Sequence, residues 1–185
     1  RYENDHQAAQ RGTSLCQSCQ KKSQKNMKNS LKKGLSFGLT SAVITTLGLM
    51  VGLNSSTGSK LAVISGILVI ALADAFSDSL GVHISEESNK ENSSRHVWEA
   101  TIATFLTKAI FALSFLIPFI FFKLSTSILI SIVWGVIILS VLSYKISNEK
   151  ERKNFSVVFE HLLIAVVVIL ISYYLGLLIN NFFNS

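Results

Sequence analysis

Five long apolar runs dominate this 185-residue sequence and constrain what it can fold into. They lie at about residues 35–53, 61–84, 100–122, 125–144 and 157–182. A helix needs about 20 apolar residues to cross the hydrocarbon core of a bilayer, where its backbone hydrogen bonds are satisfied internally. Hydrophobic residues make up 49% of the chain, which argues against an ordinary soluble domain. The sequence therefore predicts an all-α, polytopic membrane protein with five transmembrane helices in one domain, residues 34–183.

A polar leader, residues 1–33, precedes the first apolar run. It is rich in Gln, Lys, Asn and Ser, a composition that cannot bury a core, and we expect a disordered, basic cytoplasmic segment beside the membrane. No aromatic side chain is interleaved with its lysines, so binding of nucleic acid is not expected. Cys16 and Cys19 are the only cysteines; their CxxC spacing is either a weak metal site or a feature of an inert tail.

The distribution of Lys and Arg among the connections predicts the orientation. Fourteen of these cations fall in the leader, in the connection after the second run and in the connection after the fourth, whereas Lys60 and Lys123 fall in the other two connections. Because cytoplasmic loops carry an excess of Lys and Arg, we expect the N-terminus in the cytoplasm and the C-terminus outside. The membrane would be the plasma membrane of a prokaryote or a vacuole-like organelle membrane of a eukaryote.

The second apolar run carries two aspartates, Asp74 and Asp78, where side chains should meet hydrocarbon. An intramembrane Asp costs roughly 2.5–3.5 kcal/mol on insertion scales, so such a residue marks a functional site by default. Positions four apart share a helix face, so the two carboxylates stack one turn apart, with Ser77 beside them and His83 further toward the cytoplasm. Oxygen and imidazole ligands suit a divalent cation such as Mn²⁺ or Fe²⁺, and the same residue types serve a proton relay.

Four glutamates follow at the foot of this helix, namely Glu86, Glu87, Glu91 and Glu99. Their position predicts a cytoplasmic metal entrance that leads to the aspartates. Taken alone, Glu86, Glu87 and Glu91 are more typical of an ordinary solvated loop face, and their position at the foot of the Asp-bearing helix makes the two interpretations about equal.

One cation, Lys108, lies within the third apolar run and is a candidate charge partner of the acids. In a purely structural role it would pair with one aspartate and lock two helices together, which would leave the second aspartate without a partner. Alternatively, it tunes the two carboxylates or binds Asp74 in the empty state of a transport site.

Two segments resemble the first two helices of the vacuolar iron transporter family. They read GLSFGLTSAVITTLGLMVGLNSS, residues 34–56, and SGILVIALADAFSDSLGVHISEES, residues 65–88. The likeness rests on the GLSxGLT opening, the Asn- and Ser-rich turn and the ADAFSDSLG run, and with five spans it covers roughly residues 34–182. The resemblance implies a homodimeric carrier that moves Fe²⁺ or Mn²⁺ out of the cytosol against protons, along a pathway lined by the first two helices at the dimer interface.

The chain departs from the family pattern at two positions. Phe37 stands where members usually carry a metal-binding Asp, and Asp78 stands where they usually carry a pathway Met. We infer that the acid has moved from one helix to the facing one, which keeps the charge and hardens the site toward oxygen ligands. The extended glutamate-rich cytoplasmic domain of plant and parasite members is reduced here to a short connection at about residues 86–99.

The expected function is export of Mn²⁺ or Fe²⁺ from the cytoplasm by proton antiport, for metal homeostasis. The metals are cargo, and no permanently bound cofactor is expected. An enzyme is not expected, because the sequence has no glycine-rich phosphate loop, no nucleophile elbow and no HExxH pair. The expected partners are metal ions, protons, the lipid bilayer and a second copy bound through the first two spans. The alternative is a non-transporting membrane metal sensor or assembly subunit whose buried charges are structural.

Overall fold

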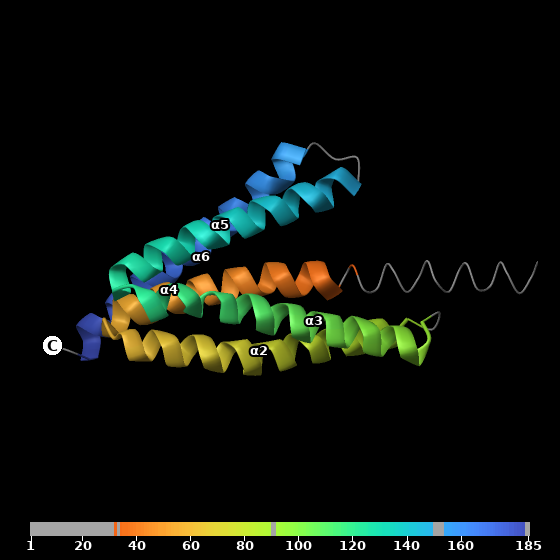
Figure 1. The fold of residues 1–185 in the computed structure, drawn as a ribbon, viewed down its shortest axis with the longest axis horizontal. Coiled ribbons are helices and arrows are strands. Elements are labelled where there is room, and N and C mark those ends of the chain that lie inside the picture. Colours follow the sequence, from red (N-terminus) through yellow and green to blue (C-terminus); the bar gives the residue numbers. More distant parts are fainter. Residues whose placement is uncertain (1–31, 33, 90–91, 150–153, 184–185) are drawn as a thin grey trace, which may run out of the picture.

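The computed structural model describes residues 32, 34–89, 92–149 and 154–183, and the regular elements there are all helices (Figure 1). The predicted leader, apart from Lys32, lies outside the described residues. Cys16 and Cys19 belong to this leader and therefore lie outside the described residues. Glu91 lies outside them too, in the gap at residues 90–91.

The first helix comprises Gly34–Thr57. It is followed by α2 (Lys60–Glu87), α3 (Ser94–Ser114), α4 (Leu116–Phe121), α5 (Leu124–Glu149) and α6 (Asn154–Phe183). With α3 and α4 counted as one span, the described residues form five helices that are long and apolar enough to cross a membrane, which confirms the predicted all-helical, five-span architecture there. These helices indicate a multi-pass integral membrane protein, while the side on which each terminus lies stays a prediction.

The third span is broken where the sequence places the only proline. α3 ends at Ser114, and α4 begins at Leu116 and contains Pro118. A proline removes the hydrogen bond to the carbonyl four residues earlier and its ring clashes with that carbonyl, so the helix is interrupted there. The indole Nε1 of Trp134 on α5 donates a hydrogen bond to Ser114 Oγ at 3.2 Å, which ties the break to the next span.

The turn between the first helix and α2 is shorter than the sequence suggests. A polar connection was expected from Asn54 to Lys60, but helix continues to Thr57 and only Gly58 and Ser59 form the turn. Hydroxyl groups in the last helical turn bond to carbonyls three or four residues earlier, as Thr57 Oγ1 does to Leu53 O at 2.7 Å. Gly58 has a φ of 60°, a left-handed conformation that glycine adopts at little steric cost.

The first helix lies at the centre of the helix contacts. Its N-terminal half packs on α3, where a Cβ at Gly34 would lie 2.7 Å from the carbonyl oxygen of Ala100. Its C-terminal half packs on α6, where a Cβ at Gly48 would lie 2.9 Å from a methyl group of Val168. In Figure 1 the first helix, α2 and α3 run alongside one another, whereas α5 and α6 diverge from them away from α4.

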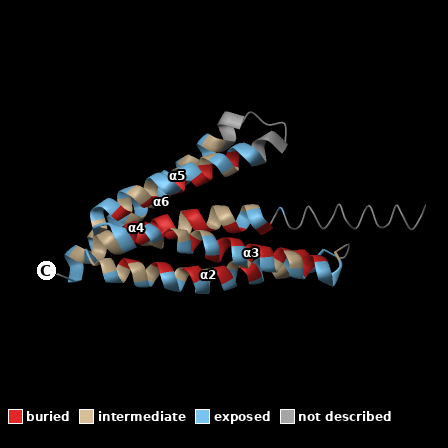
Figure 2. Cartoon of the chain, viewed as in Figure 1, coloured by how far each residue is buried: buried red, intermediate tan, exposed pale blue. Residues whose placement is uncertain are grey.

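The buried core joins residues from all five spans, and Figure 2 shows buried segments on the first helix and on its neighbours. It comprises Val43, Leu47, Met50, Val63, Ile67, Phe115, Phe119, Ile138, Leu139 and Ala165. Large apolar side chains also cover the outside, with Phe76, Ile120, Phe121, Phe159 and Phe182 each at least 63% exposed. A soluble protein rarely presents so much contiguous apolar surface, so this exterior fits a lipid environment.

The close contact between the first helix and α3 predicts that a side chain at position Gly38 destabilises the protein. A Cβ there would lie 2.8 Å from the backbone oxygen of Thr104, so Gly38→Ala forces the two helices apart. We expect a loss of about 1–3 kcal/mol in the free energy of unfolding, as for other overpacked sites. Gly81→Ala is the matched control, because a Cβ at Gly81 meets nothing within 4 Å and Ala favours helix by up to about 1 kcal/mol. Thermal unfolding of the purified protein in detergent measures both, and equal losses in the two variants would contradict the packing argument.

Candidate functional site

Lys108 on α3 lies at the meeting point of three helices, and its side chain is 1% exposed. Its Nζ lies 2.5 Å from Oδ2 of Asp74 and also donates a hydrogen bond to Oδ2 of Asp78. The Asp74 contact is an ion pair that lacks hydrogen-bond geometry. One lysine therefore contacts both intramembrane carboxylates of α2.

Ser41 on the first helix completes this network. Its hydroxyl donates to Asp78 Oδ2 at 2.6 Å, and its oxygen accepts a hydrogen bond from Lys108 Nζ at 2.7 Å. A serine hydroxyl has one proton to give, so its donor capacity is used on Asp78. Ser41, Asp74, Asp78 and Lys108 are called the charge cluster below.

The pattern of α2 explains why both acids face the same neighbour. Its buried side chains repeat every four positions as Val63, Ile67, Ala71, Ala75 and Ser79. Asp74 and Asp78 each precede one residue of this stripe, so they flank it on one side, one turn apart. The alanines let α3 approach closely enough for the Lys108 ammonium to reach between the two carboxylates.

The charge cluster combines two acidic side chains with one basic side chain at membrane depth. Asp74 lies near the midpoint of the 28-residue α2, about 20 Å from either end at 1.5 Å per residue. With both carboxylates ionised and one ammonium between them, the cluster has a net charge of −1. The side chains of Asp74 and Asp78 are 27% and 20% exposed, so both reach the surface of the single chain.

The structure corrects one step of the sequence argument. A structural pairing with Lys108 was expected to leave one aspartate without a partner, but Lys108 contacts both. The reason is geometric, because two carboxylates one helical turn apart can present their Oδ2 atoms to a single ammonium. A structural role for both charges is therefore more plausible than the sequence suggested.

His83 lies away from the charge cluster. Its Nδ1 is 3.0 Å from Thr101 Oγ1, and that hydroxyl donates to the Val97 carbonyl at 2.7 Å, so Nδ1 is the donor in the contact between His83 and Thr101. The imidazole also meets the Trp98 ring edge-on, with 4.9 Å between ring centroids. Nine residues separate His83 from Asp74, which is two and a half helical turns and places them on opposite sides of α2.

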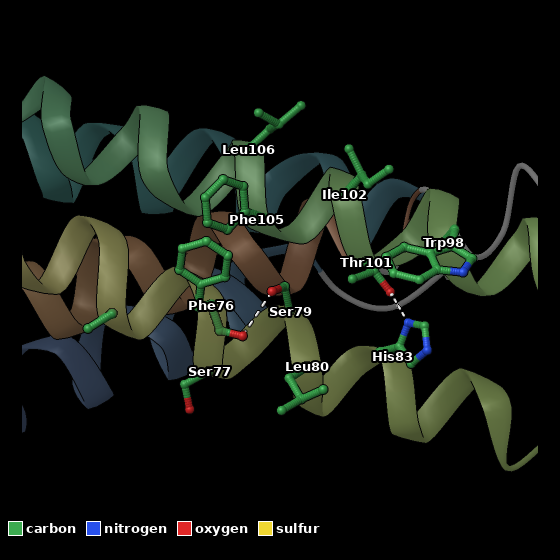
Figure 3. Close-up of a pocket in the computed structure, with 11 residues that line it drawn as sticks. Phe76, Ser77, Ser79, Leu80, His83, Trp98, Thr101, Ile102, Phe105 and Leu106 are labelled. Atoms are coloured by element: carbon green, nitrogen blue, oxygen red, sulfur yellow. Dashed lines mark hydrogen bonds between the residues drawn. The ribbon is translucent and has the colours of Figure 1, made fainter.

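His83 and Ser77 instead line an apolar groove of about 680 Å³ between α2 and α3 (Figure 3). The other lining residues are Ala73, Phe76, Ser79, Leu80, Trp98, Thr101, Ile102, Phe105 and Leu106. Phe76 and Phe105 stack across it with 4.6 Å between ring centroids. This groove opens to the outside of the chain, on a side of α2 different from that of the charge cluster.

Three members of the predicted glutamate entrance, Glu86, Glu87 and Glu99, lie within the described residues, and the entrance itself stays a prediction. Glu86 is 8% exposed and accepts a hydrogen bond from Asn92 Nδ2 at 2.7 Å, whereas Glu87 is exposed. Glu99 pairs with Arg95 on the surface of α3 at 2.9 Å. Within the described ranges, no three His, Cys, Asp or Glu side chains lie close enough together to hold a metal ion.

A second groove, of about 600 Å³, runs along the first helix between α2 and α6. Thr45 and Ile70 lie at its near end, and each is one helical turn from a member of the charge cluster, Ser41 and Asp74 respectively. Ser56, beside the Gly58 turn, lies at the far end. The groove therefore begins about one helical turn from the charge cluster and extends toward the end of the bundle predicted to face outside.

Ser41 is the member of the charge cluster that the sequence analysis missed. The available signal was its position four residues after Phe37, on the helix face where the resemblance places a metal-binding acid.

Comparison with known protein families finds no matching family model, and comparison with curated proteins finds no match either.

Proposed function

We propose that this protein is a membrane transporter that exports a divalent transition metal, Mn²⁺ or Fe²⁺, from the cytoplasm in exchange for protons. The observation that carries the proposal is that two aspartates share a single lysine and a serine hydroxyl within three apolar spans. An uncompensated charge at that depth is costly, and it is balanced when a proton or a cation enters. A site with that property binds cations and protons in competition.

The ligand chemistry supports a hard or borderline cation. Asp74 and Asp78 supply carboxylate oxygens and Ser41 supplies a hydroxyl oxygen, a set that suits Mn²⁺ or Fe²⁺. The charge cluster of one chain offers two carboxylates, so water, backbone oxygens or a second copy would complete the coordination of the cargo. The groove from Thr45 to Ser56 supports a route between the charge cluster and the outside.

A second copy of the chain is part of the proposal. The two carboxylates are partly exposed on the outer surface of a single chain, and lipid cannot solvate them. A symmetric partner that packs on the first helix and α2 would cover this surface and bring two charge clusters together. The resemblance of residues 34–56 and 65–88 to the vacuolar iron transporter family supports the same arrangement.

The dimer can be tested by cross-linking at Phe37, which is 49% exposed one turn from Ser41. In a background with Cys16→Ser and Cys19→Ser, Phe37→Cys is expected to form a disulfide-linked dimer in membranes under mild oxidation. Leu129→Cys is the matched control, because Leu129 is 64% exposed on α5 and should remain monomeric. Equal cross-linking at both positions would contradict the proposed interface.

Transport itself is tested with the purified protein in sealed liposomes. Uptake of Mn²⁺, Fe²⁺, Mg²⁺ and Ca²⁺ is measured with no pH gradient and with a gradient of either sign. We expect Mn²⁺ or Fe²⁺ uptake that rises when protons can leave the liposome as metal enters. Uptake no faster than in protein-free liposomes, for every metal and gradient, would refute the proposal.

One observation favours a second function. Lys108 contacts both aspartates, so the charges can be satisfied within one chain and serve only to hold helices together. In that case the protein is a non-transporting membrane metal sensor or an assembly subunit. If the charges are only structural, Asp74→Asn should lower the abundance of folded protein. If the protein is a transporter, Asp74→Asn should be made and dimerise normally, but it should no longer change the metal sensitivity of growth.

A further inference from the structure

We infer that the Lys108 ammonium is a resident cation of the transport site, which the cargo must displace. This inference rests on the transport function proposed above. The ammonium contacts Oδ2 of both aspartates and the oxygen of Ser41. It therefore occupies the position between the carboxylates that a bridging metal ion would take.

Lys108 and a divalent cargo ion cannot share that position, because like charges repel strongly in a buried site. The lysine has a flexible four-carbon stem, so its ammonium can withdraw while its backbone stays fixed in α3. The ammonium also donates to Ser41 Oγ at 2.7 Å. This hydrogen bond must therefore be given up together with the two aspartate contacts when the cargo takes the position of the ammonium.

A resident cation changes the state in which the empty carrier returns. In an exchange for protons, the metal-free site with ionised carboxylates needs one proton to return neutral when Lys108 is in place, and two when it is absent. A return step that waits for the second proton is slower, because each uncompensated charge is costly within the membrane. Exchange of one cargo ion for another avoids this step, because the carrier crosses loaded in both directions.

The first experiment compares net metal uptake with exchange in liposomes. For Lys108→Gln we expect net Mn²⁺ uptake to fall roughly a hundredfold, while exchange of labelled Mn²⁺ against unlabelled Mn²⁺ inside falls less than about threefold. Lys108→Arg retains the cation and should keep net uptake within about tenfold of wild type. Lys123→Gln, which removes an exposed lysine of the α4–α5 turn, should change neither rate. A lysine that only locks helices would lower net uptake and exchange together, and that result would overturn the inference.

The second experiment can be carried out even if Lys108→Gln fails to fold. Its variants keep one acid in place of two, so they leave less unpaired charge than Lys108→Gln does. In Asp74→Asn the ammonium pairs with the one remaining acid, so we expect Mn²⁺ binding to weaken by more than about tenfold. Adding Lys108→Gln to that variant frees Asp78 and should restore binding by about tenfold or more. Isothermal titration of the purified proteins with Mn²⁺ gives both values.

The outcomes separate the two proposals. If the wild-type protein neither binds nor transports any of the metals tested, the transport function is refuted and this inference falls with it. If the wild type transports metal but the double variant binds Mn²⁺ no better than Asp74→Asn, Lys108 is not a competitor for the site. Restored binding in the double variant together with the loss of net uptake in Lys108→Gln supports the inference.

Discussion

Replacement of Asp78 with Asn is expected to reduce Mn²⁺ or Fe²⁺ transport by about a hundredfold or more. Asp78 accepts hydrogen bonds from both Ser41 and Lys108, so it is the carboxylate with the most contacts in the charge cluster. Asn removes the negative charge and leaves Lys108 with Asp74 as its single anionic partner. Loss of a buried charged partner typically costs about 3 kcal/mol or more, which corresponds to at least a hundredfold in binding. The measurement is initial metal uptake into liposomes at equal protein content.

Two neighbouring substitutions on α2 serve as controls for Asp78→Asn. Ser77→Ala and His83→Gln alter residues that line the groove between α2 and α3 and leave the charge cluster intact. We expect each to change uptake less than about threefold. If Asp78→Asn transports both metals as well as wild type, the assignment of the site is wrong. If His83→Gln is as inactive as Asp78→Asn, the pathway includes the opposite side of α2.

The second large effect concerns stability. The double substitution Asp74→Asn and Asp78→Asn leaves the Lys108 ammonium, which is 1% exposed, without an anionic partner. Breaking a buried ion pair in this way costs about 3–5 kcal/mol, because the remaining charge is neither paired nor hydrated. Adding Lys108→Met removes that charge and should recover most of the lost stability. The three proteins are compared by thermal or denaturant unfolding in the same detergent.

A surface ion pair provides the matched control for this stability series. Arg95 and Glu99 lie four residues apart on α3, and the Arg95 side chain is 81% exposed. Pairs of this kind contribute about 0.3–0.5 kcal/mol, so Arg95→Gln with Glu99→Gln should barely change the unfolding midpoint. Stability that falls further in the triple variant than in the double variant would show that the lysine contributes packing rather than an unpaired charge.

The spans could be predicted from the sequence because length and hydropathy alone decide which helices can cross a bilayer. The expected runs and the observed helices agree to within a few residues at most ends. The end of the first helix was missed, because Ser55, Ser56 and Thr57 are typical of turns. In the structure their hydroxyls bond to carbonyls of the same helix and extend it.

The charge cluster was only partly predictable. The spacing of Asp74 and Asp78 placed both on one face, and Lys108 was identified as a candidate partner from its depth alone. The contact of Ser41 with Asp78 depends on how the first helix is rotated against α2, which hydropathy does not specify. The side of α2 on which His83 lies could have been predicted from the sequence, because a period of 3.6 residues places His83 opposite Asp74.

The separation of Lys108 from Asp78 along the chain, 30 residues, bears on how the protein enters the membrane. During synthesis α2 is complete, with two acids, before its cationic partner has been made. The first helix and α2 are joined by only Gly58 and Ser59, so they enter as a hairpin. Stable insertion of that hairpin is therefore expected to wait for α3. Nascent chains that end before Lys108 should remain extractable from membranes by alkali, whereas chains that end after Phe121 should resist extraction.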